Sequence, residues 1–120
     1  MTNKYYNDAI IGNKKIIASY TEKGELQRFC YPEIDGRQFI DYFQTGVKIN
    51  DSNLIYLHQD INNKYSQEYV KNTNILKTNI ENTYFNLRIE QIDFALIDQN
   101  IIVKKYIFKN NNSVDLDTKF

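Results

Sequence analysis

The chain has 120 residues, of which 15 are basic and 15 are acidic, so its formal net charge is zero. This length fits one small domain. A neutral chain has no surplus of positive charge with which to hold nucleic acid or an anionic membrane surface, so we expect neither partner. Hydrophobic residues make up 42% of the chain, with 10 Tyr and 7 Phe among them. This is enough apolar material for a packed core, which excludes disorder throughout.

The N-terminal end predicts a polar tail over residues 1–8, followed by a single domain over residues 9–120. No apolar region of signal-peptide length follows the charges of the tail, and the longest apolar run, residues 94–97, is too short to cross a bilayer. Cys30 has no second cysteine with which to form a disulfide, which agrees with a reducing compartment. We therefore expect a cytoplasmic protein.

The composition favours strands over helices. The chain contains 17 Ile besides its many aromatic residues, but only 3 Ala. β-Branched and aromatic side chains lose rotamer freedom on a helix and pack well on a pleated sheet. The 16 Asn residues are suited to the turns between strands. These preferences predict an all-β domain, built as an antiparallel β-sandwich.

The first third of the chain predicts two successive hairpins. Ile10 and Ile11 lead into a turn at Gly12-Asn13. Strands at residues 16–20 and 25–31 flank a second turn, in which Gly24 can adopt the positive φ that a tight turn often requires. The apolar spacing of residues 39–43 also suits one face of a short helix, and here we favour an extended strand.

The remaining two thirds predict further strands separated by turn residues. These strands are expected at residues 46–49, 54–58, 66–70, 75–80, 84–96 and 101–108. In the longest of them the apolar residues occupy odd positions up to Ile89 and even positions from Ile92 onward. Because a one-residue slip would otherwise turn Ile92 and Phe94 towards water, the pattern predicts a β-bulge or a sharp bend near Glu90-Gln91.

The last residues, 113–120, begin an apolar and polar alternation that stops without a turn signal. We expect an interrupted strand, and therefore a sandwich domain that is incomplete at its C-terminus. An incomplete sheet exposes an unpaired strand edge, through which two copies of the chain can form a homodimer.

Few side chains are spaced for catalysis or metal binding. His58 and Asp60 could be two metal ligands or an oriented base, but a structural role for His58 is favoured. Cys30 lacks the surroundings of a nucleophile and is interpreted as a small core residue. The ten Tyr residues are spread along the chain and are interpreted as core or rim residues rather than as a sugar-stacking cluster.

The acidic residues nearest to one another in the middle of the chain are Glu33, Asp35 and Asp41, with Arg37 among them. The carboxylates could form the acid/base pair of a glycosidase, but solvated ion pairs are the favoured interpretation. We therefore expect no catalytic residue, no metal site and no cofactor in this chain.

Several segments resemble a known family. Residues 9–13 and 24–35 are similar to the opening of the N-terminal domain of bacterial glucoamylase and glucodextranase-like proteins in glycoside hydrolase family 15. The likeness continues through residues 45–49, 56–61, 74–78 and 84–94, and it covers nearly all of residues 9–110. The chain departs from the family at Asn13-Lys14, where a second Gly is usual, and in having no Trp.

The resemblance implies that this domain is part of a larger super-sandwich. That sandwich is non-catalytic and supports a C-terminal catalytic α/α barrel. Two Glu residues of that barrel would hydrolyse the α-glucosidic bonds of an α-glucan with inversion, and none of the barrel matches this chain. The candidate interdomain loop consists of Tyr31, Pro32, Glu33 and Asp35, because Pro32 fixes the local φ and removes one ladder donor. An ordinary surface turn is the alternative for this loop. For the whole chain, the alternative is a stand-alone carbohydrate-binding or protein-interaction sandwich.

Overall fold

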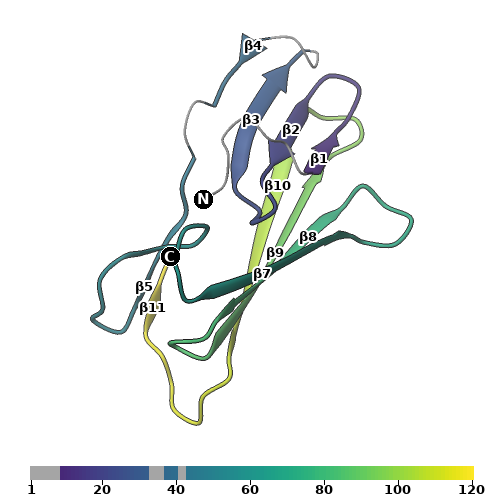
Figure 1. Cartoon of the computed structure of the whole chain (residues 1–120). Helices are drawn as coiled ribbons and strands as arrows, with labels where there is room; N and C mark the ends of the chain where they lie inside the picture. Colours follow the sequence, from purple (N-terminus) through teal and green to yellow (C-terminus); the bar gives the residue numbers. More distant parts are fainter. Residues whose placement is uncertain (1–8, 33–36, 41–42) are drawn as a thin grey trace.

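The computed structural model describes residues 9–32, 37–40 and 43–120. Within these ranges the chain forms strands β1 to β11 and no helix, and all of the strand pairs are antiparallel (Figure 1). The all-β class and the antiparallel arrangement are therefore as the composition predicts. The N-terminal tail that we expect at residues 1–8 lies outside the described residues.

The strands are arranged in three sheets. The first has the order β1-β2-β3-β4 and contains β1 Ala9–Gly12, β2 Ile17–Tyr20, β3 Leu26–Tyr31 and β4 Arg37–Gln38. The second has the order β10-β9-β8-β7 and contains β7 Asn63–Tyr69, β8 Leu76–Asn82, β9 Leu87–Ala95 and β10 Ile102–Asn110. The third has the order β11-β5-β6 and contains β5 Gly46–Ile49, β6 Ile55–Tyr56 and β11 Thr118–Lys119.

The long β7–β10 sheet forms one layer, and the two smaller sheets pack against different ends of it (Figure 1). At one end Leu76 of β8 joins a hydrophobic cluster with Ile11 and Tyr20 of the first sheet. At the other end Ile80 and Ile89 join a second cluster with Val47 and Ile49 of β5 and with Leu57. Burial of these two clusters holds the layers together, because each sheet then removes one apolar face from water.

Most strands predicted from the sequence are present with small shifts at their ends. The strand expected at residues 54–58 is shorter than predicted. Only β6, Ile55–Tyr56, is paired there, because residues 57–59 form a turn. Residues 39 and 40 are not helical, and residues 41 and 42 lie outside the described residues. The C-terminal alternation at residues 113–120 contributes only β11, which pairs with β5.

The bulge predicted near Glu90-Gln91 is wrong. The pairing of β9 with both neighbours runs without a register shift from Leu87 to Asp93. Inward and outward positions alternate along the whole strand, so Gln91 and Asp93 take the buried positions and Ile92 lies on the other face. The irregularity in register lies instead in the β2–β3 hairpin, where Ser19 pairs with Arg28 and Tyr20 pairs with Leu26.

The turn between β2 and β3 shows why a glycine is required there. Gly24 has a φ of 84°, and a Cβ added to it would lie 2.8 Å from the Oγ1 of Thr78 and 3.0 Å from its Cγ2. Thr78 is fully buried, so it has little room to move. We expect Gly24→Ala to lower the free energy of unfolding by more than about 1 kcal/mol, because a left-handed conformation alone costs an alanine roughly this much.

Urea denaturation of the variant measures this loss. The matched control is Gly46→Ala, since Gly46 has no positive φ and its added Cβ would meet only the flexible side chain of Leu54. A Gly24 variant as stable as the unmodified protein would contradict the argument.

The outward edge of β1 is closed by a side chain from the other layer. The hydroxyl of Tyr69 accepts a hydrogen bond from the backbone N–H of Ile10 at 2.9 Å and donates one to its carbonyl at 2.8 Å. An open strand edge is a template for unwanted pairing. Tyr69 therefore satisfies both backbone groups of Ile10 at this edge, and it links the first sheet to the β7–β8 hairpin.

Candidate functional site

A polar band crosses the inner face of the β7–β10 sheet between its two hydrophobic clusters. By strand register, Thr78, Gln91 and Tyr106 lie side by side on β8, β9 and β10, and Asp93 lies beside Lys104 in the next inward row. Thr78, Gln91 and Asp93 are each 0% exposed. Polar groups at such depth cost free energy unless they are hydrogen-bonded, so their partners decide whether the fold is stable.

Gln91 is the centre of this network. Its Oε1 accepts from Nε2 of His58 at 2.8 Å, and its Nε2 donates to the carbonyl of Gly24 at 2.9 Å and to Oδ2 of Asp93 at 2.7 Å. Because both protons of the Gln91 amide are used, its oxygen acts as the acceptor and the Nε2 of His58 carries a proton. Gln91 thereby connects β9 to the turn between β2 and β3 and to the turn after β6.

The carboxylate of Asp93 is neutralised by Lys104. The Nζ of Lys104 donates to Oδ1 of Asp93 at 2.6 Å, and the two side chains are 14% and 0% exposed. The same ammonium lies 5.0 Å from the ring centre of Tyr20, 5.5 Å from that of Phe43 and 5.9 Å from that of Tyr106. Burial lowers the pKa of Lys104 from its ordinary value, and the charge of Asp93 opposes that shift.

Two further pKa values reflect the depth of the network. Burial is the largest cause that lowers the pKa of His58 to about 4, although its hydrogen bond to Gln91 opposes the shift. Burial also raises the pKa of Tyr106 to about 12. His58 is therefore neutral at physiological pH, and Asp93 and Lys104 form the charged pair of the network.

The structure assigns His58 a buried structural role, in agreement with the interpretation that the sequence favours. His58 and Asp60 follow β6 in a turn and do not share a strand face. Both border a cavity of about 650 Å³, which Glu25 also lines. The Oδ1 of Asp60 accepts from the backbone N–H of Asn62 at 2.7 Å, and the part of the chain that is described has no group of three or more metal-ligating side chains.

The other candidate residues occupy the first sheet. Cys30 is a free, buried thiol on β3, as expected for a small core residue. Tyr31 ends the same strand, pairs with Arg37 of β4 and lies with its ring 6.3 Å from that of Phe39. Pro32 follows and is exposed. The candidate loop is thus the connection of an edge hairpin, and Glu33, Asp35 and Asp41 lie outside the described residues.

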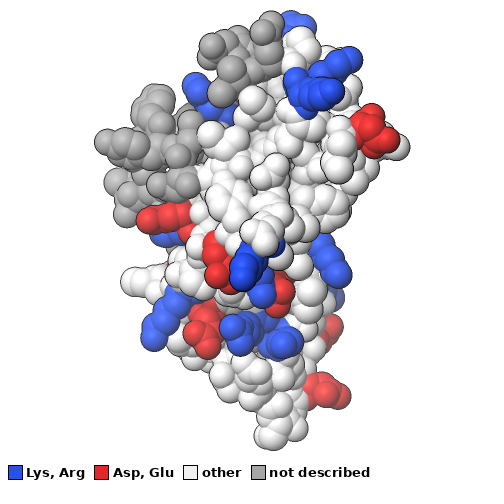
Figure 2. All heavy atoms as spheres, turned by 90° about the vertical axis from the view of Figure 1, so that its right-hand side faces the viewer, with Lys and Arg blue, Asp and Glu red and all other residues white. Residues whose placement is uncertain are grey.

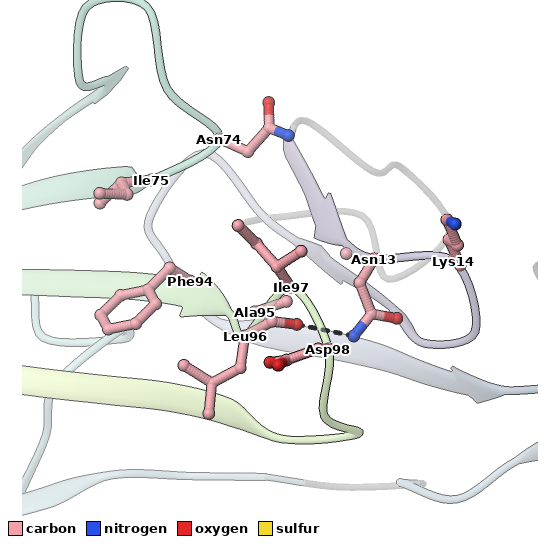
Figure 3. Close-up of a pocket in the computed structure, with 10 residues that line it drawn as sticks. Asn13, Lys14, Asn74, Ile75, Phe94, Ala95, Leu96, Ile97 and Asp98 are labelled. Carbon is pink, nitrogen blue, oxygen red and sulfur yellow. Dashed lines mark hydrogen bonds between the residues drawn. The ribbon is translucent and has the colours of Figure 1, made fainter.

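An open, mainly apolar groove of about 880 Å³ lies where three turns meet. It is lined by the turn between β1 and β2, the end of the β7–β8 hairpin and the turn between β9 and β10 (Figure 3). Its apolar walls are formed by Ile75, Phe94, Leu96 and Ile97. Ile97 is 91% exposed, in a turn where polar residues are usual.

A single side chain fastens two of these turns together. The Nδ2 of Asn13 donates to the carbonyls of Leu96 at 2.8 Å and Gln99 at 2.9 Å, and the first of these bonds is drawn in Figure 3. Its Oδ1 accepts from the backbone N–H groups of Lys15 and Ile16. All four hydrogen-bonding positions of the amide are used, so the groove is held in one shape.

Neither the buried polar network around Gln91 nor the apolar groove was predicted from the sequence, although each of them leaves a signal in the sequence. The change of apolar phase at Glu90-Gln91 marks the point where polar residues take over the buried positions of β9, which is an alternative to a bulge. Likewise the signal for the groove is Ile97, an isoleucine between two predicted strands that the folded chain leaves 91% exposed.

The outer surface carries charges of both signs. In Figure 2 basic and acidic side chains are intermixed over the lower half of the visible face, and the centre of the upper half is mostly uncharged. On the outer face of the long sheet Lys77 pairs with Glu90 at 3.3 Å. Over the described ranges there is no helical segment with the length and apolarity needed to span a bilayer.

Comparison with known proteins gives one informative relative. The chain is 26% identical over 114 residues to a protein of Methanocaldococcus jannaschii called "Uncharacterized glycosyl hydrolase MJ1610". The aligned region includes 95% of this chain but spans only 18% of the length of that relative. No protein-family profile matches the chain, and no solved structure shows significant similarity to it. The chain is related to a domain of a glycosyl hydrolase.

Proposed function

We propose that this chain is a non-catalytic β-sandwich domain of a glucoamylase-like enzyme of glycoside hydrolase family 15. The observation that carries the proposal is the extent of the match: nearly all of this chain aligns with a small part of a much longer glycosyl hydrolase. In this proposal the catalytic α/α barrel belongs to the rest of the polypeptide, where it hydrolyses an α-glucan. The sandwich supports the barrel by packing against it.

The chemistry of the buried acid supports a non-catalytic role. Inverting glycosidases need two carboxyl groups roughly 6.5–9.5 Å apart on either side of the scissile bond, one acting as acid and one as base. Among the described residues Asp93 is the fully buried carboxylate, and both of its oxygens are committed, one to Lys104 and one to Gln91. An acid fixed in this way can neither reach a sugar nor exchange a proton with one.

The proposal is tested by comparing the 120-residue chain with the complete product of its gene on maltooligosaccharides. We expect the chain alone to release no glucose. The complete product should release β-glucose, the anomer that inversion of an α-bond yields, as observed by proton NMR. Hydrolysis by the chain alone, or a complete product that is inactive on α-glucans, would reject the assignment.

A further inference from the structure

The groove between the three turns has the features of an interaction surface. Ile97 is 91% exposed, and Ile101, at the other end of the same turn, is 46% exposed. Behind them Phe94 and Leu96 are half-buried in the wall of the groove. Soluble domains rarely leave a continuous apolar surface to water without a partner for it, because each exposed side chain forfeits the free energy of burial.

The groove is also preorganised. Asn13 makes two hydrogen bonds to the turn that carries Ile97 and two to its own turn. The turn itself is closed by a hydrogen bond of 3.1 Å from the N–H of Leu96 to the carbonyl of Ile101. A surface that is already rigid loses little conformational entropy when a partner packs on it, so its apolar contacts contribute more fully to binding.

We propose that this groove is the surface on which the catalytic part of the same polypeptide packs, through apolar side chains that enter between Ile75, Phe94 and Ile97. The inference rests on the proposed function and adds a defined contact to it. The relative extends far beyond the aligned region, which spans only 18% of the relative's length, so in the proposed function a large covalently attached partner is available. A tethered partner is present at high effective concentration, and for that reason a groove of about 880 Å³ is sufficient.

Charge at the rim defines the partner further. Lys14 and Asp98 border the groove, while its walls are apolar. We expect the partner to present an apolar cluster with an acceptor facing Lys14 and a donor facing Asp98, as in interdomain contacts that bury an apolar centre within a polar rim.

Hydroxyl-radical footprinting tests the contact side chain by side chain. The complete gene product and the 120-residue chain are labelled in parallel and analysed by mass spectrometry. We expect labelling of Ile97 and Phe94 to fall several-fold in the complete product. Ile61, which is 95% exposed and outside the groove, is the matched control and should be labelled equally in both.

The outcomes separate this inference from the proposed function. If Ile97 stays as reactive in the active complete product as in the short chain, the groove is not the interface and the inference fails. Protection of Tyr31 alone would then favour the candidate loop, with the proposed function intact. Protection of Ile97 in the short chain that increases with its concentration would indicate a second copy as the occupant, which also overturns the inference.

A pair of variants gives an independent readout. We expect Ile97→Ser to make the sandwich and the remainder of the complete product unfold in separate thermal transitions, because their coupling is lost. Ile61→Ser should leave the coupling unchanged. Both variants should unfold at the same temperature in the 120-residue chain, since neither side chain is buried there. If Ile97→Ser leaves the thermal transitions of the complete product unchanged, the groove is not the interface between the two parts.

Discussion

Replacing Asp93 by Asn should be among the most destabilising single changes in this chain. The substitution keeps the shape of the side chain but removes the charge opposite Lys104, whose side chain is only 14% exposed. Removing one partner of a buried ion pair typically costs about 3–5 kcal/mol, because the other charge is left without compensation in a medium of low dielectric constant. The aromatic rings around the Lys104 ammonium offset a part of that cost.

The control lies on the same strand. Glu90 pairs with Lys77 on the outer face at 3.3 Å, with both side chains partly exposed to solvent. We expect Glu90→Gln to change the free energy of unfolding by less than about 1 kcal/mol, as is usual for surface pairs. Urea denaturation of both variants measures the difference, and equal losses would show that burial of the Asp93 pair has no special weight.

A double variant separates charge from packing. In Asp93→Asn with Lys104→Met neither charge remains, and methionine fills a similar volume. We expect this double variant to regain a substantial part of the stability that Asp93→Asn loses. If it is as unstable as the single variant, the loss arises from the hydrogen bond to Gln91 and not from the unpaired ammonium.

The second large effect is a loss of stability in mild acid that originates from His58. The folded protein holds the pKa of His58 at about 4, below the ordinary value of 6.5, mainly because the ring is buried. Between these values the unfolded chain binds a proton that the folded protein does not, so stability decreases as pH falls from about 7 to about 4. At about 1.4 kcal/mol per pKa unit the total change is on the order of 3 kcal/mol.

The groups around His58 determine how the effect must be measured. The positive charge of Lys104 favours the neutral ring, the negative charge of Asp93 favours the protonated one, and Glu25 lines the same cavity. Burial raises the pKa of Glu25, so this carboxyl acts in the opposite direction, and its proton uptake stabilises the folded state as pH falls.

His58→Gln removes the imidazole and retains an N–H donor for Gln91. We expect the stability of wild type relative to the variant to fall as the pH decreases from about 7, and the difference to level off only about one pH unit below the folded-state pKa of about 4. The contribution of Glu25 is common to both proteins and cancels in this difference. A difference that does not depend on pH would mean that His58 is not the group that responds.

Local patterns were sufficient for much of the fold. Alternation along β8 and turn residues such as Gly24 act over a few neighbouring positions, so they can be read without knowing what packs above them. The same local logic failed at Gln91. It assumes that a buried position is apolar, and it therefore predicts a bulge where the strand runs straight.

From the sequence alone the chain was determined to be an antiparallel all-β domain, with its hairpins in nearly correct places and with His58 and Cys30 as interior residues. Tertiary structure alone decided that Gln91 and Asp93 are core residues, because their partners come from positions as distant as Gly24, 67 residues away along the chain. It also decided that Asn13 joins two turns that are 83 residues apart. The physical reason is that backbone preference is local, whereas the cost of burying a polar group depends on partners that only the folded chain brings within hydrogen-bonding distance.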